Sequence, residues 1–299
     1  MAGLILSVPY ASPFLPKAII KRMTLSPEEL RWENWRLTDP FLLEVVKKAL
    51  EPEPSSSGPS RDLVKREGAS PHNLPKTLLL PYPFSPLVAD PLGLLAVELG
   101  LLTSPKPFIL TRGALEKDLP TWSESEKEFI FSHCVQPYVD KLVQAGQTLL
   151  AEESLVLLIT IRFFSHKVWL HDHRELPKPQ INLGQAAGLS PQGLTSLAGH
   201  IFRRFGLWTE LDYPLAGTHI PAAMAAWPRL KALGLAIRRD LYLDETKGAL
   251  KASAGSLART LRVFFSLLGQ ELDRVAQVRL KRAFPPKPPS NIIKAGQLT

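Results

Sequence analysis

The stretch Leu155-Val-Leu-Leu-Ile-Thr-Ile-Arg-Phe-Phe-Ser165 decides the fold of this chain. Its apolar run is nearly continuous, is too short to cross a membrane, and lacks the spacing of an amphipathic helix. Such a run is typical of a strand buried on both faces in the middle of an α/β sheet. In these sheets the ligand site lies beyond the carboxyl ends of the strands. We therefore expect the site of this protein around Arg162, Phe163, Phe164, Ser165 and His166.

The composition indicates one sizeable core. The chain has 299 residues, of which 45% are hydrophobic, and a formal charge of +8, a balance that permits contact with acidic partners but does not define a fold. The lone Cys134 excludes an intramolecular disulfide and a multi-cysteine metal cluster, and we expect a buried, inert thiol. Neither a signal peptide nor a run of about 20 apolar residues is present. We predict a soluble, cytoplasmic protein without membrane contact.

We expect a single domain over residues 1–284, without internal repeats. Residues 51–71 are rich in Pro and Ser and predict a mobile low-complexity insertion, and residues 285–299 predict a Pro-rich tail. A capping box at Ser26 begins a helical region that breaks near Pro40, and Pro137 predicts a kink in a second long helix. The predicted strands are 3–8, 77–80 and 235–237 in addition to the central one, and the other predicted helices are 123–150, 190–205 and 253–283.

Two loops carry candidate polar residues. His171 and His173 flank Asp172 close to His166, which permits a metal site, although a polar surface turn explains the same residues. In the loop 211–221, Asp212 and His219 supply polarity and Gly217 permits close backbone approach, and a purely structural loop is the alternative.

The last predicted helix is basic. Its cations are Arg259, Arg262, Arg274, Arg279, Lys281 and Arg282. They suggest a nucleic-acid face, but aromatic side chains are not interleaved with them, and we expect ordinary solvated charges and no nucleic-acid partner. A phosphate-binding Gly-rich loop, a Gly-x-Ser-x-Gly elbow and a His-Glu-x-x-His motif are all missing from the sequence.

Several segments resemble the N-formylglutamate amidohydrolases, metal-dependent amide hydrolases whose core is related to zinc carboxypeptidases. The resemblance is strongest in residues 178–184, 212–217 and 238–245, and residues 4–9, Trp35 and 136–138 also correspond. It implies a three-layer αβα fold with a mostly parallel or mixed central sheet.

The resemblance also implies a zinc site that this chain has lost. Tyr10 and Phe164 stand where the family has metal-binding histidines, Asn34 stands where it has an acidic ligand, and Ala236 stands where it has a glutamate that looks catalytic. Val139 replaces a further histidine, and Glu33 and Asp39 are only displaced substitutes for the acid. Zinc hydrolysis needs nitrogen or carboxylate ligands and a base, and a cationic Arg162 repels a divalent ion.

From these departures we predict a protein that resembles N-formylglutamate amidohydrolase but is catalytically degenerate. It would bind a small acidic or N-acylated molecule without a cofactor, through Arg162 together with Arg238 or Arg239. The candidate cleft residues are Tyr10, Asn34, Arg162, Phe164, Ser165, Asp212, Gly217, His219 and Arg238. One alternative is an active metal-dependent hydrolase of N-formyl or N-acyl amide bonds, with zinc relocated to His166, His171, Asp172 and His173. The other alternative is an interaction protein that uses the basic last helix.

Overall fold

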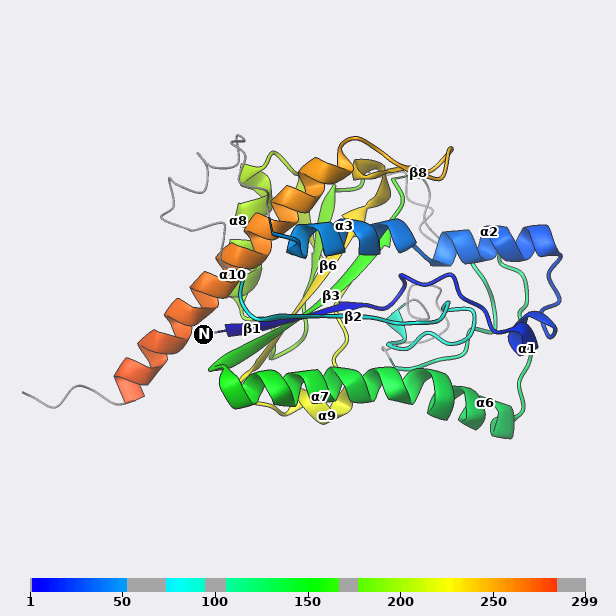
Figure 1. The fold of residues 1–299 in the computed structure, drawn as a ribbon, viewed down its shortest axis with the longest axis horizontal. Coiled ribbons are helices and arrows are strands. Elements are labelled where there is room, and N and C mark those ends of the chain that lie inside the picture. The colour runs from blue at the N-terminus through cyan, green and yellow to red at the C-terminus, as the bar shows by residue number, and fades with distance from the viewer. Residues whose placement is uncertain (1, 53–73, 95–105, 167–176, 284–299) are drawn as a thin grey trace, which may run out of the picture.

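The computed structural model describes residues 2–52, 74–94, 106–166 and 177–283. They form a three-layer αβα arrangement around a six-stranded sheet (Figure 1). One layer contains α3 (Pro40–Leu50), α8 (Gln192–Arg204) and α10 (Ala254–Ala283), and the other contains α7 (Gln136–Glu152) and α9 (Ala222–Ala225). The predicted fold class is confirmed.

The sheet is mixed, with β3 near its centre. The strands are β1 (Ala2–Val8), β2 (Thr77–Pro81), β3 (Leu155–Phe164), β4 (Ile181–Gly184), β5 (Thr209–Leu211) and β6 (Leu230–Arg238). Their order is β2-β1-β3-β6-β4-β5, and only the β4–β6 pair is antiparallel. All ten residues of β3 are buried, as expected for a strand covered on both faces. A separate two-stranded ribbon pairs β7 (Leu243–Asp244) with β8 (Ala249–Leu250).

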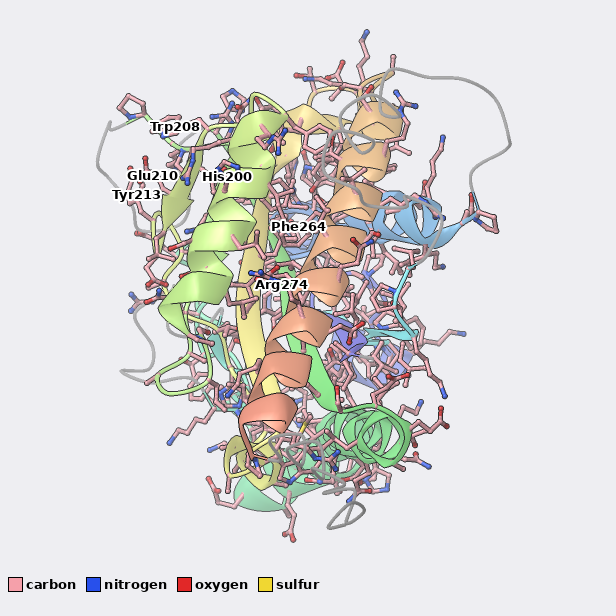
Figure 2. The ribbon with its side chains drawn as sticks, turned by 90° about the vertical axis from the view of Figure 1, so that its left-hand side faces the viewer. His200, Trp208, Glu210, Tyr213, Phe264 and Arg274 are labelled. Atoms are coloured by element: carbon pink, nitrogen blue, oxygen red, sulfur yellow. The ribbon has the colours of Figure 1, made fainter. Side chains whose placement is uncertain are left out.

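The two faces of the sheet bury different side chains. The face toward α3, α8 and α10 is apolar, and its paired rows are Leu6–Ile159–Leu233, Ile161–Leu235–Leu183 and Phe163–Ile237–Ile181. Phe264 of α10 closes this layer by stacking on Phe202 of α8, with ring centroids 4.4 Å apart (Figure 2). The face toward α7 begins with the apolar row Ile5–Leu158–Ala232, but its next rows carry small and polar residues, Ser7–Thr160–Gly234–Gly184 and Arg162–Ala236–Asn182. We call these the apolar face and the polar face.

The helix boundaries follow the local sequence signals. Ser26 and Glu29 form the predicted capping box of α2 (Pro27–Leu37), and Asp39 caps α3, so the helical region breaks where Pro40 predicts. The helix α6 (Glu124–Ile130) passes through a π-helical turn (Phe131–Val135) into α7, of which Pro137 is the second residue. Because proline lacks an N–H donor, the widened turn lies where the regular ladder would be broken. The short helix α1 (Lys17–Ile20) and the 3-10 turn Arg239–Leu241 complete the described elements.

Some predictions concern other parts of the chain. The proposed insertion at 51–71 lies almost entirely outside the described residues, and so does the Pro-rich tail at 285–299. The strand predicted at 235–237 is part of the longer strand β6, which begins at Leu230 and ends at Arg238. Among the described residues, none of the helices is both long and apolar enough to span a bilayer.

Candidate functional site

The structure moves part of the expected site into the sheet. The sequence led us to expect Arg162, Phe163 and Phe164 beyond the end of β3. They are instead its last three residues. The reason is that β6 extends far enough to pair with all three of them, and Phe164 lies opposite Arg238. Phe164 is fully buried in the core, so it lines no open cleft.

Arg162 lies on the polar face directly beside Ala236. These two residues are register partners in β3 and β6, and Asn182 of β4 is the next partner in the same row. By the resemblance, Ala236 stands where the amidohydrolase family has a glutamate. A small neutral side chain therefore lies beside the Arg162 cation. Arg162 is 2% exposed and donates from Nη2 to the carbonyl oxygens of Gly217 at 3.0 Å and Ala216 at 3.4 Å.

The loop that contains Gly217 is held against the polar face from both ends. The Asp212 carboxylate accepts hydrogen bonds from the backbone N–H groups of Gln185 at 3.0 Å and Gly217 at 2.8 Å. A Cβ atom at Gly184 would lie 2.1 Å from the Gly217 carbonyl oxygen, so the close approach requires glycine there. Gly217 is therefore bound to both Arg162 and Asp212, and the contacts that these residues make position the loop.

The polar face also contains buried groups away from this loop. Ser7 and Tyr138 share a hydrogen bond of 2.7 Å between β1 and α7. Burial raises the pKa of the Tyr138 hydroxyl above its usual range, so this hydroxyl stays protonated. Asn182 Oδ1 and Thr160 Oγ1 are buried without a hydrogen-bond partner in the described part of the protein.

His219 follows the Gly217 loop and is half-buried. Burial lowers the pKa of its imidazole below the usual value, because desolvation disfavours the charged form. The ring is therefore neutral at physiological pH and offers one donor and one acceptor nitrogen.

Tyr10 and Asn34 bind residues of other segments. The Tyr10 hydroxyl donates to Asp90 Oδ1 at 3.0 Å. Asn34 donates to the Pro13 carbonyl oxygen and accepts from the Ser85 hydroxyl, both at 2.7 Å. Each side chain thus joins two segments that are distant in sequence.

The displaced acids Glu33 and Asp39 are also engaged. Glu33 is buried and accepts from the backbone N–H groups of Ala114 and Leu115, and burial raises the pKa of its carboxyl despite these bonds. Asp39 accepts from the Leu42 N–H at 2.9 Å, as the N-cap of α3. Its other oxygen receives the Tyr242 hydroxyl at 2.6 Å.

The strongest buried ion pair at the carboxyl end of the sheet was missed by the sequence analysis. Arg239 Nε lies 2.9 Å from Asp39 Oδ2, and the two side chains are 2% and 0% exposed. The guanidinium also covers the Phe163 ring, with its carbon 4.1 Å from the ring centroid, and donates to the backbone carbonyl oxygens of Trp35 and Thr38. The sequence analysis had named Arg239, within the segment 238–245, and Asp39 only separately, as a candidate ligand arginine and as a displaced acid, and nothing in the sequence paired them.

A second, more exposed cluster lies around Glu245. Ser165 donates to Glu245 Oε1 at 3.0 Å, and His166 Nδ1 lies 3.8 Å from the same oxygen. Arg238 does not join this cluster, since its guanidinium binds both oxygens of Asp240 and donates to the Lys178 carbonyl oxygen.

The residues present do not fit a zinc ion at the positions that the resemblance indicates. The Tyr10 hydroxyl is hydrogen-bonded to Asp90, and the Asn34 amide is hydrogen-bonded to Pro13 and Ser85. The side chains of Phe164, Ala236 and Val139 have no atom that can bind a metal. Within the described residues, no three His, Cys, Asp or Glu side chains are grouped as metal ligands. His171, Asp172 and His173 of the alternative site lie outside the described residues.

The basic last helix and Cys134 were the remaining candidates. Arg262 is buried and donates to the backbone carbonyl oxygens of Ala49 and Glu51, while Arg274 pairs with Glu271 on the surface (Figure 2). The side chains of Arg279, Lys281 and Arg282 lie outside those described. Cys134 lies in the π-helical turn and is only partly buried, and desolvation raises the pKa of its thiol.

Comparison with known proteins gives matches only among solved structures. No protein-family model and no curated protein matches the chain. The crystal structure of N-formylglutamate amidohydrolase from Ralstonia eutropha JMP134 matches with a TM-score of 0.65 and 18% identity, over 91% of this chain and 94% of that one. The structure of a gene product from Agrobacterium tumefaciens matches with a TM-score of 0.61 and 16% identity, over 91% of each chain. The chain therefore has the fold of N-formylglutamate amidohydrolase, at low sequence identity.

Proposed function

We propose that this chain is a non-hydrolytic protein on the N-formylglutamate amidohydrolase fold, and that it binds a small acidic or N-acylated molecule beside Arg162. The observation that carries the proposal is the pairing of Arg162 with Ala236 on the polar face. Metal-dependent hydrolysis needs anionic or imidazole ligands and a base. This row instead contains a guanidinium, a methyl group and a neutral amide.

The chemistry of the row suits a carboxylate and an acyl amide. A guanidinium binds a carboxylate through short, charge-assisted hydrogen bonds that are stronger than those to neutral carbonyl oxygens. A ligand carboxylate would therefore compete with the carbonyl oxygens of Ala216 and Gly217 for Arg162. Asn182 Oδ1, in the same row, can accept an amide N–H, and the neutral His219 can donate to an acyl oxygen.

The other two arginines suit this role less well. Arg239 is buried against Asp39, and Arg238 is bound to Asp240 through two nitrogen atoms. Taking either guanidinium for a ligand would leave a carboxylate without its cation, which is costly for the buried pair. Arg162 is thus the arginine that we assign to the ligand.

Calorimetric titration with N-acetylglutamate and N-formylglutamate tests the proposal. We expect binding to the wild type, a loss of about tenfold or more in affinity for Arg162→Met, and little change for the control Arg238→Met. If Arg162→Met does not fold, Arg162→Lys keeps the charge and loses the planar fork, and weaker binding is again expected. A folded wild type that gives no binding heat, or an Arg162 variant that binds as tightly as the wild type, would overturn the ligand assignment.

The non-hydrolytic part has a separate test. Purified protein, as isolated and after incubation with zinc, is incubated with N-formylglutamate, and formate release is measured. We expect no release above the buffer rate. Release that requires His166 or His173 would instead establish the alternative enzyme with a relocated metal, and would refute this part of the proposal.

A further inference from the structure

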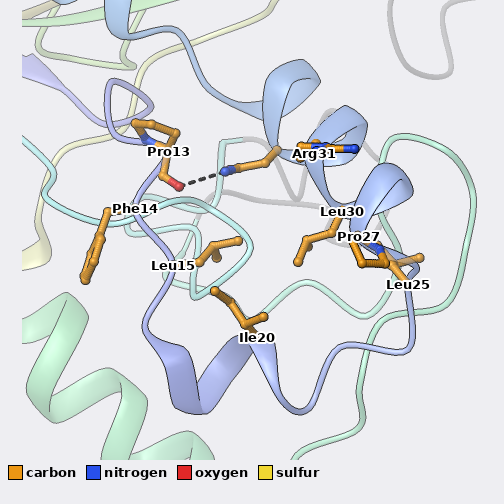
Figure 3. A pocket seen from close by; sticks show the side chains of 9 residues that line it. Pro13, Phe14, Leu15, Ile20, Leu25, Pro27, Leu30 and Arg31 are labelled. Carbon is orange, nitrogen blue, oxygen red and sulfur yellow. Dashed lines mark hydrogen bonds between the residues drawn. The ribbon is translucent and has the colours of Figure 1, made fainter.

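Arg162 is covered in the structure, so a ligand reaches it after part of the chain moves. Arg162 is 2% exposed and Asn182 is 0% exposed. An open groove of about 530 Å³ lies elsewhere, between α1 and α2, and neither of these residues lines it (Figure 3). The Gly217 loop, residues 212–218, binds Arg162 Nη2 through the carbonyl oxygens of Ala216 and Gly217. This loop is therefore the segment whose movement would release Arg162 Nη2.

The Gly217 carbonyl oxygen lies in a slot on the polar face of the sheet. Gly184 and Gly234 are register partners in β4 and β6, and a Cβ atom on them would lie 2.1 Å and 2.9 Å from this oxygen. Because a side chain at either position would fill this space, the two glycines leave room for a flat carbonyl group against the sheet. We call this space the glycine slot.

Two buried side chains beside the glycine slot have hydrogen-bonding capacity that the Gly217 loop does not use. Thr160 is the register partner of Gly234, and its hydroxyl is fully buried without a partner among the described residues. Asn182 lies two residues before Gly184 on the same face of β4, and its Oδ1 atom also lacks a partner there. Buried polar atoms are nearly always hydrogen-bonded. These two atoms therefore indicate an occupant of the slot that satisfies them, as the loop does not.

A few contacts hold the Gly217 loop in place. The Asp212 carboxylate accepts from the N–H groups of Gln185 and Gly217, and the Thr218 N–H donates to the Gln185 carbonyl oxygen at 3.2 Å. Leu215 is buried, whereas Ala216 is exposed and the other residues of the loop are half-buried. Asp212 has a φ of 52°, which is unfavourable for a residue with a Cβ atom. The Asp212 carboxylate thus acts as the latch of a loop with little apolar packing.

We propose that the Gly217 loop is an autoinhibitory strap, which fills the glycine slot until a ligand replaces it. The inference rests on the proposed function, because the replacing group is the carboxylate or acyl group of that ligand. A carboxylate binds a guanidinium more strongly than a carbonyl does, so it can displace Gly217 from Arg162. With the loop lifted, the Thr160 hydroxyl donates to a ligand oxygen and Asn182 Oδ1 accepts a ligand N–H. The apparent affinity is then the intrinsic affinity multiplied by the fraction of molecules with a lifted loop.

Weakening the latch tests this regulation in calorimetric titrations with N-acetylglutamate. Asp212→Gly removes the carboxylate and suits the positive φ, so more molecules have a lifted loop, and we expect binding about tenfold tighter than in wild type. Asp244→Gly is the matched control, because that carboxylate also accepts two backbone hydrogen bonds, from Thr246 and Lys247 at 3.1 Å, and we expect unchanged affinity. If Asp212→Gly does not fold, Asp212→Asn keeps the side-chain shape with a weaker acceptor, and tighter binding is again expected.

Hydrogen exchange followed by NMR reports on the strap itself. The Gly217 N–H is bonded to Asp212, so we expect this amide to exchange faster when N-acetylglutamate binds to wild type. A ligand that only adds to the closed structure slows exchange around its site instead. Equal affinities of wild type and Asp212→Gly, or slower exchange at Gly217 on binding, would refute the strap and leave the ligand assignment intact. An absence of binding heat from both proteins would refute the ligand assignment, and the strap with it.

Discussion

The two faces of the central sheet are built from the same strands but are stabilised differently. The apolar face is covered by α3, α8 and α10 through aliphatic and aromatic packing, and at its carboxyl end the Arg239–Asp39 pair lies over Phe163. The polar face is covered by α7 and by the Gly217 loop. It is held by hydrogen bonds that Arg162 donates to the Gly217 carbonyl oxygen, that Asp212 accepts from the Gly217 N–H, and that Tyr138 shares with Ser7. The comparison teaches that alternate residues of one buried strand can serve two environments, a packed core and a positioned polar surface.

The largest effect should come from the ion pair at the end of the apolar face. Arg239→Leu leaves the Asp39 carboxylate buried without its cation, and we expect a loss of about 3–5 kcal/mol in the free energy of unfolding, measured by urea denaturation. Arg238→Leu is the matched control, because that guanidinium is 17% exposed and its Asp240 partner is 29% exposed. We expect the control to lose about 1 kcal/mol or less. Similar losses in the two variants would show that the buried pair does not stabilise this end of the face.

A smaller effect is expected where the Gly217 loop contacts the polar face. Gly184→Ala places a methyl group against the Gly217 carbonyl oxygen, so the loop must move and Arg162 must lose a partner. We expect a loss of about 1–3 kcal/mol, which is the usual cost of overpacking. Gly193→Ala in α8 is the same substitution in open space, and we expect it to be neutral or to stabilise by up to about 1 kcal/mol. A Gly184→Ala variant as stable as Gly193→Ala would contradict the tight contact.

The sequence predicted the apolar face better than the polar one. Continuous runs of Leu, Ile and Val identify a buried strand, and the Ser26 capping box identifies a helix start, because both signals are local. The Arg239–Asp39 pair joins residues 200 positions apart, and its charges look solvated when read along the chain. Arg162 and Asp212 were recognised as candidates, but sequence spacing does not show that both hold the backbone around Gly217. Which face a residue occupies depends on the register with β6, which tertiary packing sets.

The smallest expected effect, on the polar face, concerns the protonation of His219. Its folded-state pKa is lowered by burial, so between that value and the ordinary value of 6.5 the unfolded chain binds a proton that the folded chain does not. The stability that depends on the neutral ring is therefore complete above about pH 6.5, falls as the pH is lowered through this interval, and levels off below the folded-state pKa. We expect His219→Gln to remove this part of the pH dependence, so the difference between wild-type and variant unfolding curves isolates it from the carboxyl groups. NMR titration of the His219 ring should place its midpoint below that of a histidine in the unfolded chain. A midpoint at or above 6.5 would mean that water or a counter-charge reaches the His219 imidazole. In that case this imidazole is not the neutral hydrogen-bond donor that the proposed ligand site requires.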